Sequence, residues 1–311
     1  MSWLTALIAA ILILILFPLL REQLRKPMNA KARQSAPGSF ARLSGGLTHY
    51  RWNGPLRGPV AVCVHGLTTP SFVWDGVAQG LAAMGYRVLS YDLYGRGYSD
   101  RPAGLQDRAF FTSQLEELLA DQEVDDDITL IGYSMGGAIA TAFAAASPGR
   151  LRELILLAPA GFGTSPGRLT RMIRQIPGLG DWLMHALFPA LHIRGTNAER
   201  KLPSSVPGIT DLQQRELACR GYIPAVLSSL RGILNEDFTE DHRRLHSHGV
   251  PVMAIWGQED AVIPPNSPGR LAEHARSIRQ EEIPGAGHGL PYTHTGEVLQ
   301  IIAQNHRRGL L

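Results

Sequence analysis

Short, mostly apolar runs and longer amphipathic segments alternate along most of the chain. The runs predict strands, several buried on both faces, at 59–66, 86–93, 127–134, 151–160, 250–257 and 277–284. Helical patterns lie between them, at 73–84, at 107–123, directly after Ser134, from a capping Ser267 with Pro268 in the first turn, and at 293–307. Such alternation predicts an α/β fold with a mostly parallel central sheet covered by helices on both faces.

Two segments depart from this alternation. Residues 39–54, "SFARLSGGLTHYRWNG", predict a β-hairpin that turns at its Gly-Gly pair. Residues 162–248 contain amphipathic pieces such as "RLTRMIRQI" and "GDWLMHALF", separated by proline and glycine. We expect this segment to form a helical cap inserted over one edge of the sheet. The core then comprises 39–161 and 249–311.

The N-terminus has a different pattern. Trp3 to Leu20, "WLTALIAAILILILFPLL", contains no charged residue over 18 positions. As a helix it would be roughly 27 Å long, close to the hydrocarbon thickness of a bilayer. We therefore predict a transmembrane anchor at 1–20, followed by a basic juxtamembrane linker at 21–38.

The anchor has one alternative, a cleaved signal peptide. A signal peptide normally has Lys or Arg before its apolar core, and none precedes it here. The basic residues follow the apolar run instead, and by the positive-inside rule this places the globular body in the cytoplasm. A secreted or periplasmic protein after signal cleavage is the alternative localisation.

Composition excludes several classes of protein. The 311 residues are 44% hydrophobic and 18% charged, with a net charge of +3, so the chain can form a sizeable core. No basic stripe with interleaved aromatics is present, and we expect no nucleic-acid partner. The two cysteines, Cys63 and Cys219, provide no disulfide framework. His242, His246 and His248 lack neighbouring carboxylate or cysteine ligands, so we interpret them as a solvated loop and expect no metal.

The motif "GYSMG" places Ser134 between Gly132 and Gly136, where a predicted strand meets a predicted helix. On such a turn the serine hydroxyl is exposed, and side chains at the two glycine positions would collide with backbone. The N-terminal amides of the helix favour negative charge that develops on a bound group. The motif also occurs by chance in glycine-rich proteins, but its position at this junction favours a nucleophile.

A serine nucleophile needs a base, and the base needs an acid. His288, in "GAGHGLP", follows the last predicted strand and is our candidate base; His294 is its nearest rival. Asp260, in "WGQEDAVIPP", follows the preceding strand and is favoured over Glu259 as the acid. No cofactor is needed for this chemistry.

The chain resembles the α/β-hydrolase-fold serine hydrolases, in their capped esterase- and lipase-like branch. The resemblance covers roughly residues 40–308 and rests on "HGL", "YDLYGRGYSDRP", "GYSMGG", "WGQEDAVIPP" and "GAGHG" in this order. It implies a catalytic triad of Ser134, Asp260 and His288. Serine at the elbow argues against haloalkane dehalogenases and epoxide hydrolases, which are similar in fold but use aspartate there.

The resemblance also implies an oxyanion hole made by the backbone amides of Leu67 and Met135. A single Gly66 follows His65, unlike the "HGGG" loop of some lipases, and this favours the branch with a full cap. His65, Asp92 and Arg96 are expected to be structural.

The expected activity is hydrolysis of a carboxylic ester through an acyl-enzyme intermediate. The anchor and the apolar cap suggest a small apolar or lipid-derived substrate, such as a monoacylglycerol or a lysophospholipid. Carbon–carbon bond hydrolysis or acyl transfer on the same fold stays open, as does a ligand-binding signalling protein with a slow triad or a membrane-tethered scaffold. The oligomeric state is open as well.

Overall fold

The computed structural model describes residues 3–162, 167–275 and 278–308. Parts of the predicted anchor (1–2), cap (163–166) and core (276–277 and 309–311) lie outside the described residues. The described chain contains an eight-stranded sheet in the order β1-β2-β4-β3-β5-β6-β7-β8. Its strands are β1 (Ser39–Leu43), β2 (Gly46–Asn53), β3 (Val60–Val64), β4 (Arg87–Tyr91), β5 (Ile128–Tyr133), β6 (Leu151–Leu157), β7 (Val252–Gly257) and β8 (Arg279–Ile283).

The sheet is mostly parallel, as the alternation predicted. Only β1 with β2 and β2 with β4 pair antiparallel; every other neighbouring pair is parallel. All six residues of β5 are buried, which explains why the strand has no polar face in the sequence. The predicted hairpin is present, but its turn lies at Ser44-Gly45, because β2 already begins at Gly46.

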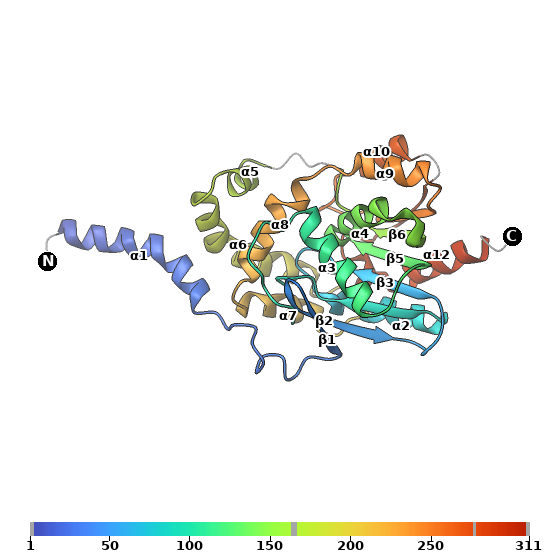
Figure 1. The fold of residues 1–311 in the computed structure, drawn as a ribbon. Coiled ribbons are helices and arrows are strands. Elements are labelled where there is room, and N and C mark those ends of the chain that lie inside the picture. The colour runs from blue at the N-terminus through green and yellow to red at the C-terminus, as the bar shows by residue number, and fades with distance from the viewer. Residues whose placement is uncertain (1–2, 163–166, 276–277, 309–311) are drawn as a thin grey trace.

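Helices cover both faces of the sheet (Figure 1). One layer contains α2 (Asp75–Ala83), α11 (Leu290–Thr293) and α12 (Thr295–Arg308), which contact one another. The other contains α3 (Arg108–Asp121), α4 (Met135–Ala146), α9 (Thr239–Ser247) and α10 (Ser267–His274). The central helix α4 is almost wholly buried between β5 and its neighbours, so the serine turn before it has a rigid support.

Two sequence interpretations are wrong in detail. Ser267 is the first residue of α10 rather than its cap; Asn266 holds the cap position, and no side chain caps the helix. His242 does not lie in a solvated loop. It is buried in α9, where its ring stacks on Phe162 at 5.2 Å, because α9 packs against α4.

Between β6 and α9 the chain forms α5 (Arg168–Gln175), α6 (Leu179–Glu199), α7 (Ile209–Arg215) and α8 (Tyr222–Arg231). These helices have a small apolar core of their own, made by Ile173, Met184, Leu217, Tyr222, Ile223, Val226 and Leu227. This core accounts for many of the apolar residues in this segment of the sequence. The limits of the cap at 162 and 248 stay a prediction.

The N-terminal helix α1 (Trp3–Gln23) has a mean hydropathy of 2.8 over its most apolar window and is long enough to cross a membrane. It packs against α6, where the Trp182 indole donates a hydrogen bond to the Ile15 carbonyl at 3.1 Å. The following stretch is bound to the body rather than free: the Lys26 amide donates to the Ala218 carbonyl at 3.0 Å, and the Lys26 carbonyl accepts from the Arg220 amide at 2.8 Å.

Candidate active site

Ser134 lies on the sharp turn between β5 and α4. Its backbone has φ 54° and ψ −119°, the strained conformation of a strand-to-helix elbow. A Cβ atom added at Gly132 would lie 2.4 Å from the Gly136 carbonyl oxygen, and one added at Gly136 would lie 2.1 Å from the Val64 carbonyl oxygen. Both distances are far below van der Waals contact, so this turn requires glycine at the two positions.

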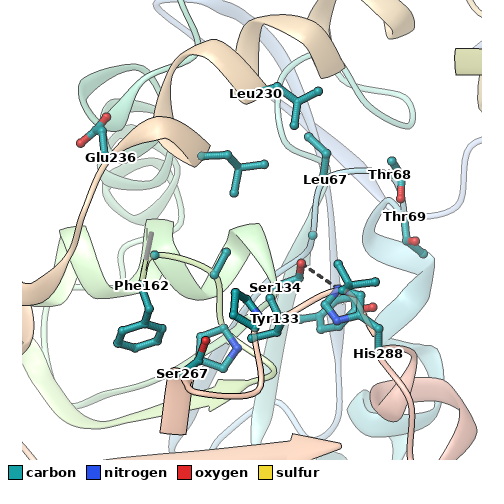
Figure 2. A pocket seen from close by; sticks show the side chains of 18 of the residues that line it. Leu67, Thr68, Thr69, Tyr133, Ser134, Phe162, Leu230, Glu236, Ser267 and His288 are labelled. Carbon is teal, nitrogen blue, oxygen red and sulfur yellow. Dashed lines mark hydrogen bonds between the residues drawn. The ribbon is translucent and has the colours of Figure 1, made fainter. Parts of the chain in front are cut away.

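His288 connects Ser134 with Asp260. Its Nε2 lies 3.0 Å from the Ser134 hydroxyl oxygen (Figure 2), and its Nδ1 lies 2.8 Å from Asp260 Oδ2. The three predicted residues thus converge from three loops at the carboxyl ends of parallel strands. The Tyr133 ring packs against the imidazole, with centroids 5.2 Å apart. The order is that of nucleophile, base and orienting acid.

The Asp260 carboxylate is held in its ionised form. Its side chain is only 7% exposed, and this burial by itself raises its pKa. The hydrogen bond and charge of His288 outweigh the burial, helped by the Val262 and Ile263 amides, which donate to Oδ1 at 2.7 and 3.0 Å. The net pKa of Asp260 therefore lies below its ordinary value, and the carboxylate can stabilise an imidazolium on His288.

The loop that carries Leu67 lies beside the serine turn. A Cβ atom added at Gly66 would lie 3.3 Å from the Ser134 Cβ, so the loop approaches the nucleophile closely. Met135 is the first residue of α4, where backbone amides lack intrahelical acceptors. Among the described residues neither the Leu67 nor the Met135 amide donates a hydrogen bond, so both are available to a bound oxygen atom.

The expected structural residues His65 and Asp92 hydrogen-bond backbone groups of the loops beside the site. His65 is buried; its Nδ1 lies 2.7 Å from the Gly66 carbonyl, and its Nε2 accepts from the Leu93 amide at 2.9 Å. Burial lowers the pKa of His65 to about 4, so it stays neutral and can accept this bond. Asp92 accepts hydrogen bonds from the Ser71 and Tyr98 amides at 2.9 Å each.

The rival candidates lie elsewhere. His294 hydrogen-bonds the Thr293 hydroxyl at 3.0 Å and lines a separate small cavity. Glu259 is exposed to solvent and does not contact the imidazole. No group of three or more metal-ligating side chains is found in the described part of the chain.

Ser134 and His288 open into a cavity of about 350 Å³ (Figure 2). Its walls combine the core loops with residues from between β6 and β7, and most are apolar; they include Leu67, Pro159, Phe162, Leu230, Leu234, Val262 and Ile263. Two charged residues line it. The Glu236 carboxylate pairs with Arg108 at 3.0 Å, whereas Arg174 has no ion-pair partner in the described structure.

Sequence reasoning missed Arg174 and Ser267 as wall residues. Arg174, on α5, is partly buried, and burial lowers the pKa of its guanidinium. Ser267 lines the cavity with a buried hydroxyl that has no hydrogen-bond partner among the described residues. Neither residue belongs to a motif. The only sequence signal for Arg174 was a charged residue in an amphipathic helix. Such a residue does not show which way its side chain points.

Residues 57–292 match the profile of the family described as serine aminopeptidase, S33. The chain belongs to this family. The match includes all the predicted site residues, and the chain is thus a hydrolase of the α/β-hydrolase fold.

The chain is also similar to curated proteins and solved structures. An uncharacterized protein of Mycobacterium tuberculosis is 28% identical over 249 residues, 74% of this chain and 70% of that protein. A pimeloyl-(acyl-carrier protein) methyl ester esterase of Nitrosomonas europaea is 28% identical over 238 residues, 74% of this chain and 89% of that enzyme. Among solved structures, the enol-lactonase of Burkholderia xenovorans LB400 superposes with a TM-score of 0.69 at 22% identity, over 86% of this chain and 98% of that one, which shows the shared fold.

Proposed function

We propose that the protein is a serine hydrolase that cleaves a carboxylic ester with an apolar, lipid-derived acyl group. The observation that carries this proposal is the Ser134–His288–Asp260 chain of hydrogen bonds at the floor of a mostly apolar cavity. A monoacylglycerol or a lysophospholipid is the substrate class we infer. The methyl ester esterase among the relatives supports ester hydrolysis, although its own substrate is not carried over.

The reaction proceeds in two halves. The Ser134 oxygen attacks the ester carbonyl while His288 Nε2 takes the hydroxyl proton, and the Leu67 and Met135 amides bind the oxyanion. The tetrahedral intermediate collapses, and His288 donates the proton to the leaving alcohol. His288 then removes a proton from water, whose oxygen attacks the acyl-enzyme, and the carboxylic acid leaves as Ser134 regains its proton. Asp260 orients the imidazole and stabilises its charged form throughout.

We further propose that α1 anchors the protein in a membrane and that the hydrolase body faces the cytoplasm. The support is the length and hydropathy of α1, its exposed apolar side chains, and the basic residues that follow it. A cleaved signal sequence would pass the same length test. However, the contacts of Lys26 with Ala218 and Arg220 tie the residues after α1 to the body, which suits a segment that is retained.

The test uses the full chain in detergent micelles with p-nitrophenyl esters of increasing acyl length and with monoacylglycerols. We expect turnover that peaks at a long acyl chain and falls by at least about a thousandfold in Ser134→Ala. A fluorophosphonate probe, which labels only an activated serine, should label the native protein and not the variant. Turnover that survives in Ser134→Ala would overturn the proposal. Labelling without ester turnover would indicate carbon–carbon hydrolysis or acyl transfer instead.

A further inference from the structure

The outer face of α5 carries an exposed apolar stripe. Leu169 and Met172 are three residues apart and share one side of the helix, and Ile176 directly follows its last residue; the three are 42%, 39% and 43% exposed. Leu179, at the start of α6, is 45% exposed and follows directly. We call these four residues the cap edge. They form no part of the apolar core that the neighbouring helices share.

Helix α5 exposes apolar side chains that a helix on a water-facing surface would bury. Such a helix buries its apolar stripe and exposes its charges. In α5 only Ile173 enters the core, Leu169 and Met172 remain exposed, and Arg174 lines the catalytic cavity. An exposed apolar patch of this kind indicates a surface that something apolar covers.

The position of α1 indicates what covers it. Figure 1 shows α5 and α6 at the same end of the molecule as α1. A groove of about 380 Å³ runs between α1 and α6, lined by Ala10, Leu14 and Phe17 on one side and Trp182 and Ala186 on the other. The Trp182 indole is hydrogen-bonded to the Ile15 carbonyl in the apolar part of α1. Ile15 precedes the end of that apolar run at Leu20 by about 8 Å of helix.

A bilayer that holds α1 must therefore reach the beginning of α6. Trp182 then lies near the boundary between lipid chains and headgroups, where tryptophan is enriched in membrane proteins. Leu179, three residues before Trp182, is at a similar position along α6. The cap edge consequently lies beside the same lipid surface.

Charge agrees with this placement. Arg21, Arg168 and Arg171 are exposed, and none has an ion-pair partner among the described residues. Arg21 ends the apolar part of α1, and the other two flank the apolar stripe of α5. Basic side chains at the rim of an apolar surface bind the phosphates of anionic lipids.

We propose that the cap edge docks into the surface of the phospholipid bilayer that α1 enters, with Arg168 and Arg171 bound to anionic headgroups. The inference rests on the proposed anchor and deepens the proposed function. Because α5 carries both part of the cap edge and Arg174 of the cavity wall, docking brings that wall close to the lipid store. A lipid ester then reaches Ser134 without crossing bulk water.

The test measures where the cap edge lies. Met172→Cys in a Cys219→Ser background provides a single reactive thiol, since Cys63 is fully buried. The full chain, labelled with an environment-sensitive nitrobenzoxadiazole, is reconstituted in vesicles of phosphatidylcholine and phosphatidylglycerol with doxyl-labelled lipid chains. We expect strong quenching at position 172 and at Leu12→Cys in α1. The matched control is Leu56→Cys, whose parent residue is 95% exposed and lies outside α1 and the cap, and which should stay unquenched.

Quenching at position 12 without quenching at position 172 would overturn docking while keeping the anchor. No quenching at either position would overturn both the docking and the anchor. An unquenched position 172 that cross-links to a second copy would assign the cap edge to an interface between copies instead. None of these readings depends on turnover, so the failure of docking and the failure of the proposed hydrolase activity are distinguishable.

A double variant tests whether docking delivers lipid substrate to the active site. Met172→Glu with Ile176→Glu alters only exposed side chains, so folding should be retained. We expect turnover of a monoacylglycerol embedded in vesicles to fall about tenfold or more, because charge opposes insertion. Turnover of a short, water-soluble ester should be unchanged. Leu105→Glu, at a site 53% exposed outside the cap edge, should affect neither. Equal loss on both substrates would contradict the proposal.

Discussion

The Arg96 guanidinium and the Leu67 carbonyl lie 3.1 Å apart, and this contact joins the proposed oxyanion loop to the cap. Arg96 is fully buried. Its other nitrogen atoms donate to the Tyr94 carbonyl at 2.9 Å and to the Ser229 hydroxyl of α8 at 2.7 Å. One planar side chain thus holds the backbone beside the Leu67 amide and a cap helix in a fixed relation.

Arg96→Lys should separate this positioning role from charge. Lysine keeps the positive charge but cannot reach three acceptors at once with a rigid fork. We expect kcat to fall about tenfold with a smaller change in KM, since the misplaced Leu67 amide binds the oxyanion less well than the ester ground state. Steady-state kinetics on one long-chain ester measures the split. A rise in KM at unchanged kcat would contradict the role.

Asp260→Asn keeps the size of the acid but removes its charge. Without a carboxylate the imidazolium on His288 loses its stabilisation, and kcat should fall on the order of a thousandfold or more. Glu259→Gln is the matched control, because Glu259 is the adjacent acid and is exposed. Its rate should equal that of the native enzyme. If the two variants lost activity equally, the assignment of Asp260 would be wrong.

Gly136→Ala should destabilise the fold. The added methyl group would lie 2.1 Å from the Val64 carbonyl oxygen and 2.5 Å from the His65 carbonyl oxygen, both rigid backbone atoms. We expect the free energy of unfolding to fall by about 3 kcal/mol, measured by denaturant titration in detergent. Gly149→Ala, where an added Cβ meets nothing within 4 Å, should change it by less than about 0.5 kcal/mol.

Glu216 makes stability depend on pH. Its carboxylate is buried beside the Gly97 amide, which donates to it at 2.9 Å, with Arg101 3.9 Å away. Burial raises the pKa of Glu216 to about 7 from an ordinary 4.5. The folded protein therefore holds this proton more tightly than the unfolded chain. The resulting stability is complete below pH about 4.5 and is lost as pH rises towards 7, by about 3 kcal/mol in total.

Glu216→Gln removes this titration while it keeps an acceptor for the Gly97 amide. We expect the native protein to lose Tm between pH 5 and pH 8 relative to the variant, as followed by thermal unfolding in detergent. Equal changes in both proteins would show that Glu216 is already ionised in the fold.

Arg174→Met tests the unpaired cation in the catalytic cavity. A guanidinium that lacks an ion-pair partner should favour a substrate with an anionic group, such as the phosphate of a lysophospholipid. We expect kcat/KM for a lysophospholipid to fall about tenfold to a hundredfold, and that for a neutral monoacylglycerol to change little. Methionine replaces the unbranched stem of the arginine and removes its charged end, so a loss on both substrates would indicate a packing role.

The sequence by itself determined the layered α/β architecture and the candidate triad. Apolar runs and helical periodicity are local consequences of which face of each element is buried, so they are visible without a structure. Ser134, Asp260 and His288 were predictable because each follows a strand, and parallel strands bring their carboxyl ends to one edge. The need for glycine at 132 and 136 was predictable for a similar reason, because the tight turn at Ser134 leaves no room for side chains two positions away.

Only the tertiary structure decided which segments each helix face and buried side chain contact. Periodicity shows that α5 has apolar residues, but not that Leu169 and Met172 stay exposed while Arg174 lines the cavity. The burial of His242 against Phe162 and the reach of Arg96 to α8 likewise join segments far apart in the chain. These pairings depend on the packing of whole helices, and a pattern within one segment carries no information about its partner.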